Sequence, residues 1–127
     1  MRTLPAFAAL AAVAGLVLST PALAHPKLLS STPAANAAIG APSQIKLTFS
    51  EELNPQLSGL EIVMNGMPGM PDHKMKVTGF KVSTGAEGKT LVADLPKPLT
   101  AGKYQVAWHV VSTDTHRLQG NLAFTVK

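Results

Sequence analysis

The sequence contains no cysteine. This absence excludes thiolate metal centres, such as blue-copper sites and zinc ribbons, and it excludes a cysteine nucleophile. Disulfide bonds cannot stabilise the fold either, so that stability must come from a hydrophobic core, which about 100 residues can supply. The chain also lacks the G-x-S-x-G pattern of a strained nucleophile turn, and nothing else in it indicates a serine triad.

Aromatic residues and clustered charges are scarce as well. The chain has one Trp and one Tyr, and its lysines are scattered singly, although basic residues outnumber acidic ones by 11 to 7. Nucleic-acid surfaces concentrate positive charge and offer aromatic rings on which bases stack. We therefore exclude nucleic acid as a ligand.

The first 24 residues, MRTLPAFAALAAVAGLVLSTPALA, have the layout of a secretory signal. Arg2 precedes an apolar stretch, and the segment ends in Ala-Leu-Ala, which is a typical cleavage box. A membrane anchor is the alternative, because no charge follows Arg2 in this segment, but Pro21 and the small residues favour cleavage. We predict an exported protein whose single mature domain spans residues 25–127 and begins at His25.

The remainder of the chain consists of short alternating stretches separated by Gly and Pro. They predict seven strands, over residues 27–31, 44–50, 59–64, 74–82, 89–95, 103–112 and 121–126. The alternation in the fourth strand changes phase at Gly79, as it does at a β-bulge. The spacing predicts an all-β fold, a small Greek-key β-sandwich of two antiparallel sheets.

One phrase supports an Ig-like sandwich in particular. Residues 99–104, Leu-Thr-Ala-Gly-Lys-Tyr, resemble a tyrosine corner, in which the Tyr hydroxyl bonds to upstream backbone. From there Tyr104, Val106, Trp108 and Val110 are expected to point into the core.

All methionines except the initiator lie in MNGMPGMPDHKM, residues 64–75. They are Met64, Met67, Met70 and Met75. Core packing is one explanation, because methionine fills gaps well. However, the three-residue spacing within a Gly/Pro loop fits neither a strand nor a helix. Thioether sulfur is a soft ligand that suits Cu(I), so the segment predicts a Cu(I) site, to which His73 can add an imidazole.

A second set of ligands is predicted for Cu(II). After cleavage, His25 offers its α-amine and its imidazole as a chelating pair, and Pro26 lacks the N–H that would otherwise become a further ligand. Asp114 and His116 are two residues apart, which places both on one side of an extended chain. Glu51 and Glu52, at the end of a predicted strand, can add an oxygen.

Each of these features has a simpler explanation. A histidine beside a cleavage site is often coincidental, and Asp-His pairs often only hydrogen-bond. His109 has no obvious partner and is interpreted as a structural histidine. Together, however, an amine, two imidazoles and a carboxylate form the tetragonal N,O set that Cu(II) prefers.

The combined motifs resemble the CopC/PcoC-like periplasmic copper-binding proteins. The resemblance rests on H-P-K-L from His25, S-x-P from Ser31, L-x-F-S-E from Leu47 and the methionine segment. It extends through G-x-Y-x-V-x-W from Gly102, S-x-D-x-H-x-x-x-G from Ser112 and L-x-F-x-V from Leu122.

This resemblance implies a periplasmic, Ig-like or cupredoxin-like β-sandwich with copper sites at its two ends. It assigns Cu(II) to His25, Glu51, Asp114 and His116, and Cu(I) to the four methionines with a loop histidine. It further implies a monomeric protein, not an enzyme, that carries or sequesters copper in copper resistance or homeostasis and acts alongside a CopD-like inner-membrane protein. In the family pattern the loop histidine follows the third methionine by two residues, whereas His73 follows Met70 by three. This spacing leaves open a site of thioethers alone.

Two other functions fit part of the sequence. A copper oxidase with an N-terminal histidine brace would share His25 and a second histidine, but the mature domain leaves little room for a broad polysaccharide-binding face. A plain adhesive Ig-like module would make the methionine segment accidental.

Overall fold

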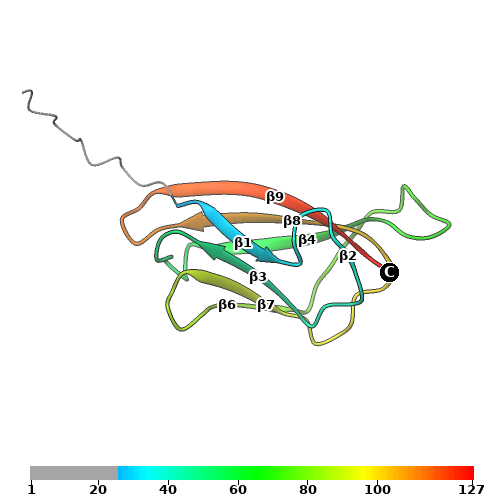
Figure 1. Ribbon diagram of the computed structural model, residues 1–127, viewed down its shortest axis with the longest axis horizontal. Coiled ribbons are helices and arrows are strands. Elements are labelled where there is room, and N and C mark those ends of the chain that lie inside the picture. Colours follow the sequence, from blue (N-terminus) through cyan, green and yellow to red (C-terminus); the bar gives the residue numbers. More distant parts are fainter. Residues whose placement is uncertain (1–25) are drawn as a thin grey trace, which may run out of the picture.

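The computed structural model describes residues 26–127, and the predicted signal segment and His25 lie outside these residues. The described chain is a sandwich of two β-sheets (Figure 1). Its strands are β1 (Leu28–Thr32), β2 (Ala38–Ile39), β3 (Gln44–Phe49), β4 (Gly59–Gly66), β5 (Met75–Lys76), β6 (Lys81–Thr84), β7 (Thr90–Asp94), β8 (Gly102–Val111) and β9 (Arg117–Val126). No helix within residues 26–127 is long and apolar enough to cross a membrane.

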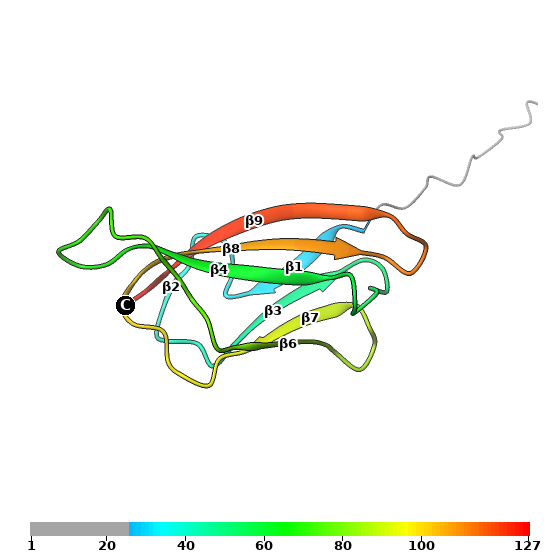
Figure 2. The same ribbon diagram turned by 180° about the vertical axis from the view of Figure 1, so that it is seen from behind.

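Each sheet combines strands from distant parts of the sequence. One sheet has the order β1-β3-β7-β6 and the other the order β2-β9-β8-β4-β5. All neighbouring strands pair antiparallel except β2 and β9, which are parallel. Seen from behind, β4, β8 and β9 run side by side along the whole molecule (Figure 2). The predicted β-sandwich is confirmed.

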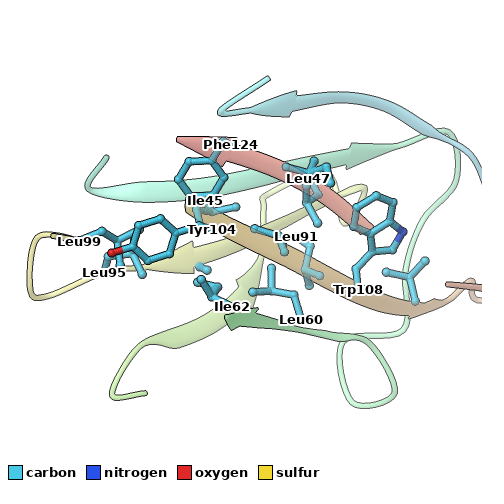
Figure 3. Packing of buried hydrophobic residues seen from close by; sticks show 14 of the residues in the cluster. Ile45, Leu47, Leu60, Ile62, Leu91, Leu95, Leu99, Tyr104, Trp108 and Phe124 are labelled. Atoms are coloured by element: carbon cyan, nitrogen blue, oxygen red, sulfur yellow. The ribbon is translucent and has the colours of Figure 1, made fainter. Parts of the chain in front are cut away.

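The core lies between the sheets and is formed by the inward-facing residue of each alternating pair (Figure 3). Ile45, Leu47 and Phe49 of β3 are fully buried, and Tyr104, Val106, Trp108 and Val110 of β8 face them from the other sheet. The predicted tyrosine corner is present, because the Tyr104 hydroxyl donates a 2.7 Å hydrogen bond to the Thr100 carbonyl. This bond fixes the loop before β8.

The prediction of a single bulged strand over residues 74–82 was wrong. The chain leaves the five-stranded sheet after β5, crosses at Gly79 with φ of +83°, and joins the other sheet as β6. Gly79 therefore changes the direction of the chain between sheets, because glycine tolerates this backbone conformation. Strand β2 was not predicted, and β9 begins four residues before its predicted start.

Candidate metal centres at opposite ends of the sandwich

Asp114 and His116 lie in the hairpin loop between β8 and β9, at the end of the sandwich where β1 begins (Figure 1). Buried Ser112 organises this loop. Its backbone N–H donates to the His116 carbonyl at 2.8 Å, and its hydroxyl oxygen accepts from the His116 N–H at 3.2 Å. Thr115 adopts a φ of +73°, which turns the chain back toward β9. Asp114 and His116 therefore come together through a turn, and not through the extended chain that their spacing was taken to predict.

Ser112 also orients the Asp114 carboxylate. The serine hydroxyl donates to Oδ1 of Asp114, and this leaves Oδ2 at 3.3 Å from Nδ1 of His116. The hydrogen bond from Ser112 lowers the pKa of Asp114, and the nearby His116 lowers it further. The carboxylate therefore stays ionised under acidic conditions that would protonate an ordinary aspartate, and an ionised oxygen is what a metal ion requires.

Glu51 is brought to the same point by backbone contacts between its strand and the hairpin loop. Leu53 forms a β-bridge with Ser112, and the Thr113 N–H donates to the Glu52 carbonyl at 3.0 Å. As a result, ligand atoms of Glu51, Asp114 and His116 all lie within 4.8 Å of one another. Glu51 and His116 are half-buried and Asp114 is exposed, so the group opens to solvent.

The N-terminal residues of the described chain enter beside this group. Pro26 is buried, and the Lys27 N–H donates to the Ser50 hydroxyl at 2.9 Å. In return, the Ser50 N–H donates to the Lys27 carbonyl at 2.8 Å. The predicted ligand His25 lies outside the described residues, but its neighbours are tied to the residue that precedes Glu51.

The methionine loop, residues 67–74, projects from the other end of the sandwich between β4 and β5 (Figures 1 and 2). The backbones of Met67 and Met70 form two hydrogen bonds. The Met67 N–H donates to the Met70 carbonyl at 3.1 Å, and the Met70 N–H donates to the Met67 carbonyl at 2.8 Å. The His73 N–H donates to the Met70 carbonyl at 3.2 Å, which brings the histidine back toward this turn. The loop is therefore a closed turn that groups Met67, Met70 and His73.

The four methionines differ in exposure. Met70 and Met75 are 53% and 51% exposed, Met67 is half-buried against the core, and Met64 is only 2% exposed. Met64 faces Met75 across β4 and β5, and both line a cavity of about 390 Å³. Met67 instead lines a separate groove of about 410 Å³. The burial of Met64 favours the packing explanation for that residue, whereas the exposed sulfurs remain accessible to a metal.

Two glycines allow the close approach of strands at the root of this loop. A Cβ on Gly102 would lie 2.5 Å from the Gly66 carbonyl oxygen and 3.5 Å from the Met64 sulfur. A Cβ on Gly66 would lie 2.5 Å from the Pro71 carbonyl oxygen. The backbones of β4, β8 and the methionine loop therefore touch directly.

His109 does not join either group. Its exposed ring packs over Gly59 on the outer face of β8. Sequence reasoning assigned no role to Ser112, although this residue orients the Asp114 carboxylate. The available signal was a hydroxyl two residues before an aspartate in a tight loop, where serine commonly bonds to nearby groups.

Comparison with known proteins identifies the family of this chain. The family model of the CopC domain matches residues 28–127. The chain belongs to the CopC family. Copper resistance protein C of Xanthomonas campestris pv. juglandis is 47% identical over 115 residues, which cover 91% of this chain and 90% of that protein. Copper resistance protein C of Escherichia coli is 46% identical and covers similar shares, 89% and 91%.

Solved structures of CopC-like proteins share the fold. PcoC, a methionine-rich copper resistance protein from Escherichia coli, superposes with a TM-score of 0.73 at 46% identity, covering 82% of this chain and all of that one. CopC from Methylosinus trichosporium OB3b gives a TM-score of 0.66 at 30% identity, covering 81% and 94%. The similarity therefore covers the sandwich that carries both groups of candidate residues.

Proposed function

We propose that this CopC-family chain is a periplasmic copper carrier that holds Cu(II) at one end of its sandwich and Cu(I) at the other. The observation that carries the proposal is the convergence of Glu51, Asp114 and His116, whose ligand atoms lie within 4.8 Å of one another. The names of the relatives, copper resistance proteins, support copper as the cargo.

The proposed Cu(II) ligands are Glu51, Asp114, His116 and the amine and ring of His25. Carboxylate and imidazole are donors that Cu(II) accepts in tetragonal geometry. The pairing of Lys27 with Ser50 supports the addition of His25, because it ties the chain next to His25 to the residue before Glu51.

The proposed Cu(I) ligands are Met67, Met70 and Met75, with His73 as an optional imidazole. Soft thioethers select Cu(I), and they carry no proton that must first be lost. Half-exposed Met70 and Met75 support this proposal, since an apolar side chain gains nothing from contact with water. We assign Met64 to packing in the core, because its side chain is only 2% exposed.

We propose a carrier and not an oxidase, because a histidine-brace enzyme would have no use for a second, thioether-rich end. We also propose that the protein acts as a monomer and exchanges copper with a CopD-like inner-membrane protein. Copper-dependent oxygen consumption with a reductant would contradict the carrier proposal in favour of the oxidase.

The Cu(II) site is tested by titrating the purified mature protein and its His116→Ala variant with Cu(II). Loss of a direct ligand should weaken binding by more than the roughly 10–100-fold that outer-shell changes cause. Binding should also weaken as pH falls, because imidazole and amine must be deprotonated to coordinate. The lowered pKa of Asp114 means that this carboxylate is not the first ligand lost to acid.

His109→Ala is the matched control, because it removes an exposed imidazole of β8 outside the proposed site. Intact mass shows whether His25 carries the free amine, and blocking that amine should weaken Cu(II) binding in the same way. Wild-type Cu(II) affinity in both His25→Ala and His116→Ala would mean that the site is elsewhere.

The Cu(I) site is tested by replacing Met67 and Met70 with leucine. This exchange keeps size and apolarity, so it should cost less than about 1.5 kcal/mol of stability. We expect Cu(I) binding to fall strongly while Cu(II) binding and folding stay near normal, and His73→Ala to have a smaller effect. Undiminished Cu(I) binding in the double variant would contradict the Cu(I) site and would mean that Met67 and Met70 serve packing.

A further inference from the structure

Basic side chains gather at the methionine end of the molecule, although they are scattered along the sequence. Lys76 and Lys97 line the same cavity as Met75, and Lys103 lines the same groove as Met67. Lys74 lies in the methionine loop itself. With Lys81, at the start of β6, and Lys127, after β9, these residues form what we call the basic collar: Lys74, Lys76, Lys81, Lys97, Lys103 and Lys127.

The two ends of the described chain differ in charge. Six of its ten Lys and Arg residues belong to the basic collar, and three acidic residues offset them at that end: Asp72, Asp94 and Glu61, which pairs with Lys76. The opposite end has three basic residues (Lys27, Lys89 and Arg117) and four acidic ones (Glu51, Glu52, Glu87 and Asp114). Side chains therefore give the methionine end a net charge of +3 and the opposite end a net charge of −1.

Little of this charge is neutralised within residues 26–127. Lys76 forms an ion pair with Glu61 at 3.3 Å, but both side chains are about 60% exposed, and pairs of this kind are weak. Lys81 faces Asp94 across β6 and β7, and Asp94 also accepts a 2.6 Å hydrogen bond from Gln44. All six lysines are exposed, so their charge is directed at solvent.

The proposed cargo does not explain the collar. Cu(I) is a cation, and neutral thioethers do nothing to offset its charge. Surrounding such a site with lysines lowers its affinity for the ion, because like charges repel. The collar must therefore be useful for something other than holding copper.

We infer that the basic collar docks the methionine loop onto an acidic face of a protein that exchanges Cu(I) with this chain. An apolar centre with a charged rim is typical of protein interfaces, and complementary charge accelerates encounter. Here exposed Met70 and Met75 supply apolar surface at this end, and the lysines of the collar supply the charge. A membrane surface fits less well, because residues 66–76 contain none of the aromatic or long aliphatic anchors that insert into lipid.

This inference rests on the proposed Cu(I) site, and it is tested by rates and not by affinity. Two synthetic acceptor peptides would present the same methionines, flanked by aspartate in one and by asparagine in the other. Cu(I) transfer from the wild-type protein to the aspartate peptide should be roughly tenfold faster at low ionic strength, since steering raises association rates by about that factor or more. High salt should remove the difference.

The decisive variant is Lys74→Gln/Lys97→Gln/Lys103→Gln, and the matched control is Lys27→Gln/Lys46→Gln/Lys89→Gln, which removes equal charge away from the collar. The first should lose the preference for the aspartate peptide, and the second should keep it. A wild-type protein that binds no Cu(I) would contradict the proposed function itself. Normal Cu(I) binding with equal rates to both peptides would overturn the docking inference alone. Collar-dependent binding to phosphatidylglycerol vesicles, without a peptide preference, would overturn it in favour of a membrane.

Discussion

At the scale of single residues, the proposed Cu(II) site depends on how one carboxylate is held. Asp114 is exposed, and an exposed aspartate normally samples several rotamers. Ser112 limits this freedom by binding Oδ1, so that Oδ2 is directed toward His116. Orientation of ligands by outer hydrogen bonds is common in metal sites and contributes strongly to affinity.

Ser112→Ala is therefore expected to lower Cu(II) affinity by about 10–100-fold. It should also cost about 1–3 kcal/mol of stability, because buried backbone groups of the loop lose a partner. Isothermal titration and chemical unfolding measure the two effects. Thr113→Ala, in the same loop, is the control and should change neither. If Ser112 acts through Asp114, its removal should cost little further affinity in an Asp114→Ala background; an equal loss there would contradict this role.

Residue patterns in the sequence predicted much of the fold, since they report local burial. The alternation around Tyr104 and Trp108 predicted the buried face of β8, and the tyrosine corner was recognised from six residues. Exposure of the methionines was not predictable in the same way. Met64 and Met75 both lie in strands and face each other, but Met75 lies at the sheet edge, and its position there depends on tertiary pairing.

At the scale of elements, the root of the methionine loop is a contact between backbones. Gly102 begins β8 directly against the Gly66 carbonyl at the end of β4, where the pairing of β4 with β8 is irregular.

The prediction of a bulge at Gly79 was wrong because a phase change in the sequence pattern looks the same whether a strand bulges or leaves its sheet. The two-residue β2 was missed because its pairing with β9 is formed by residues far apart in the chain.

Gly102→Ala should push β4 and β8 apart, because the new Cβ would lie 2.5 Å from the Gly66 oxygen. Overpacking of this kind typically costs about 1–3 kcal/mol, which thermal unfolding would measure. We expect Cu(I) affinity to fall as the loop moves, with Cu(II) affinity unchanged. Gly40→Ala is the control, since nothing lies within 4 Å of its Cβ position. Equal stability of the two variants would show that the backbone contact is not required.

At the scale of the whole molecule, the sandwich acts as a spacer between two chemically different ends. β8 has ten residues and connects the root of the methionine loop to the Asp114 hairpin loop. At about 3.3 Å per residue, it holds the two ends about 30 Å apart. The clustering of lysines at one end could not be predicted from the sequence, because these lysines lie on separate strands and loops that only the fold brings together.

The separation predicts that the two proposed copper sites are independent. Charges about 30 Å apart are almost fully screened when the Debye length is about 8 Å, and the rigid β8 links the ends without a hinge. Changes at well-separated sites usually add to within about 0.5 kcal/mol, so filling one site should alter the affinity of the other by no more than about twofold. Anaerobic Cu(I) titration of protein with and without bound Cu(II), under conditions that prevent electron exchange, measures this coupling. A larger change in affinity would mean that the sheet transmits strain between the ends, and Gly102→Ala would then be expected to alter Cu(II) binding as well.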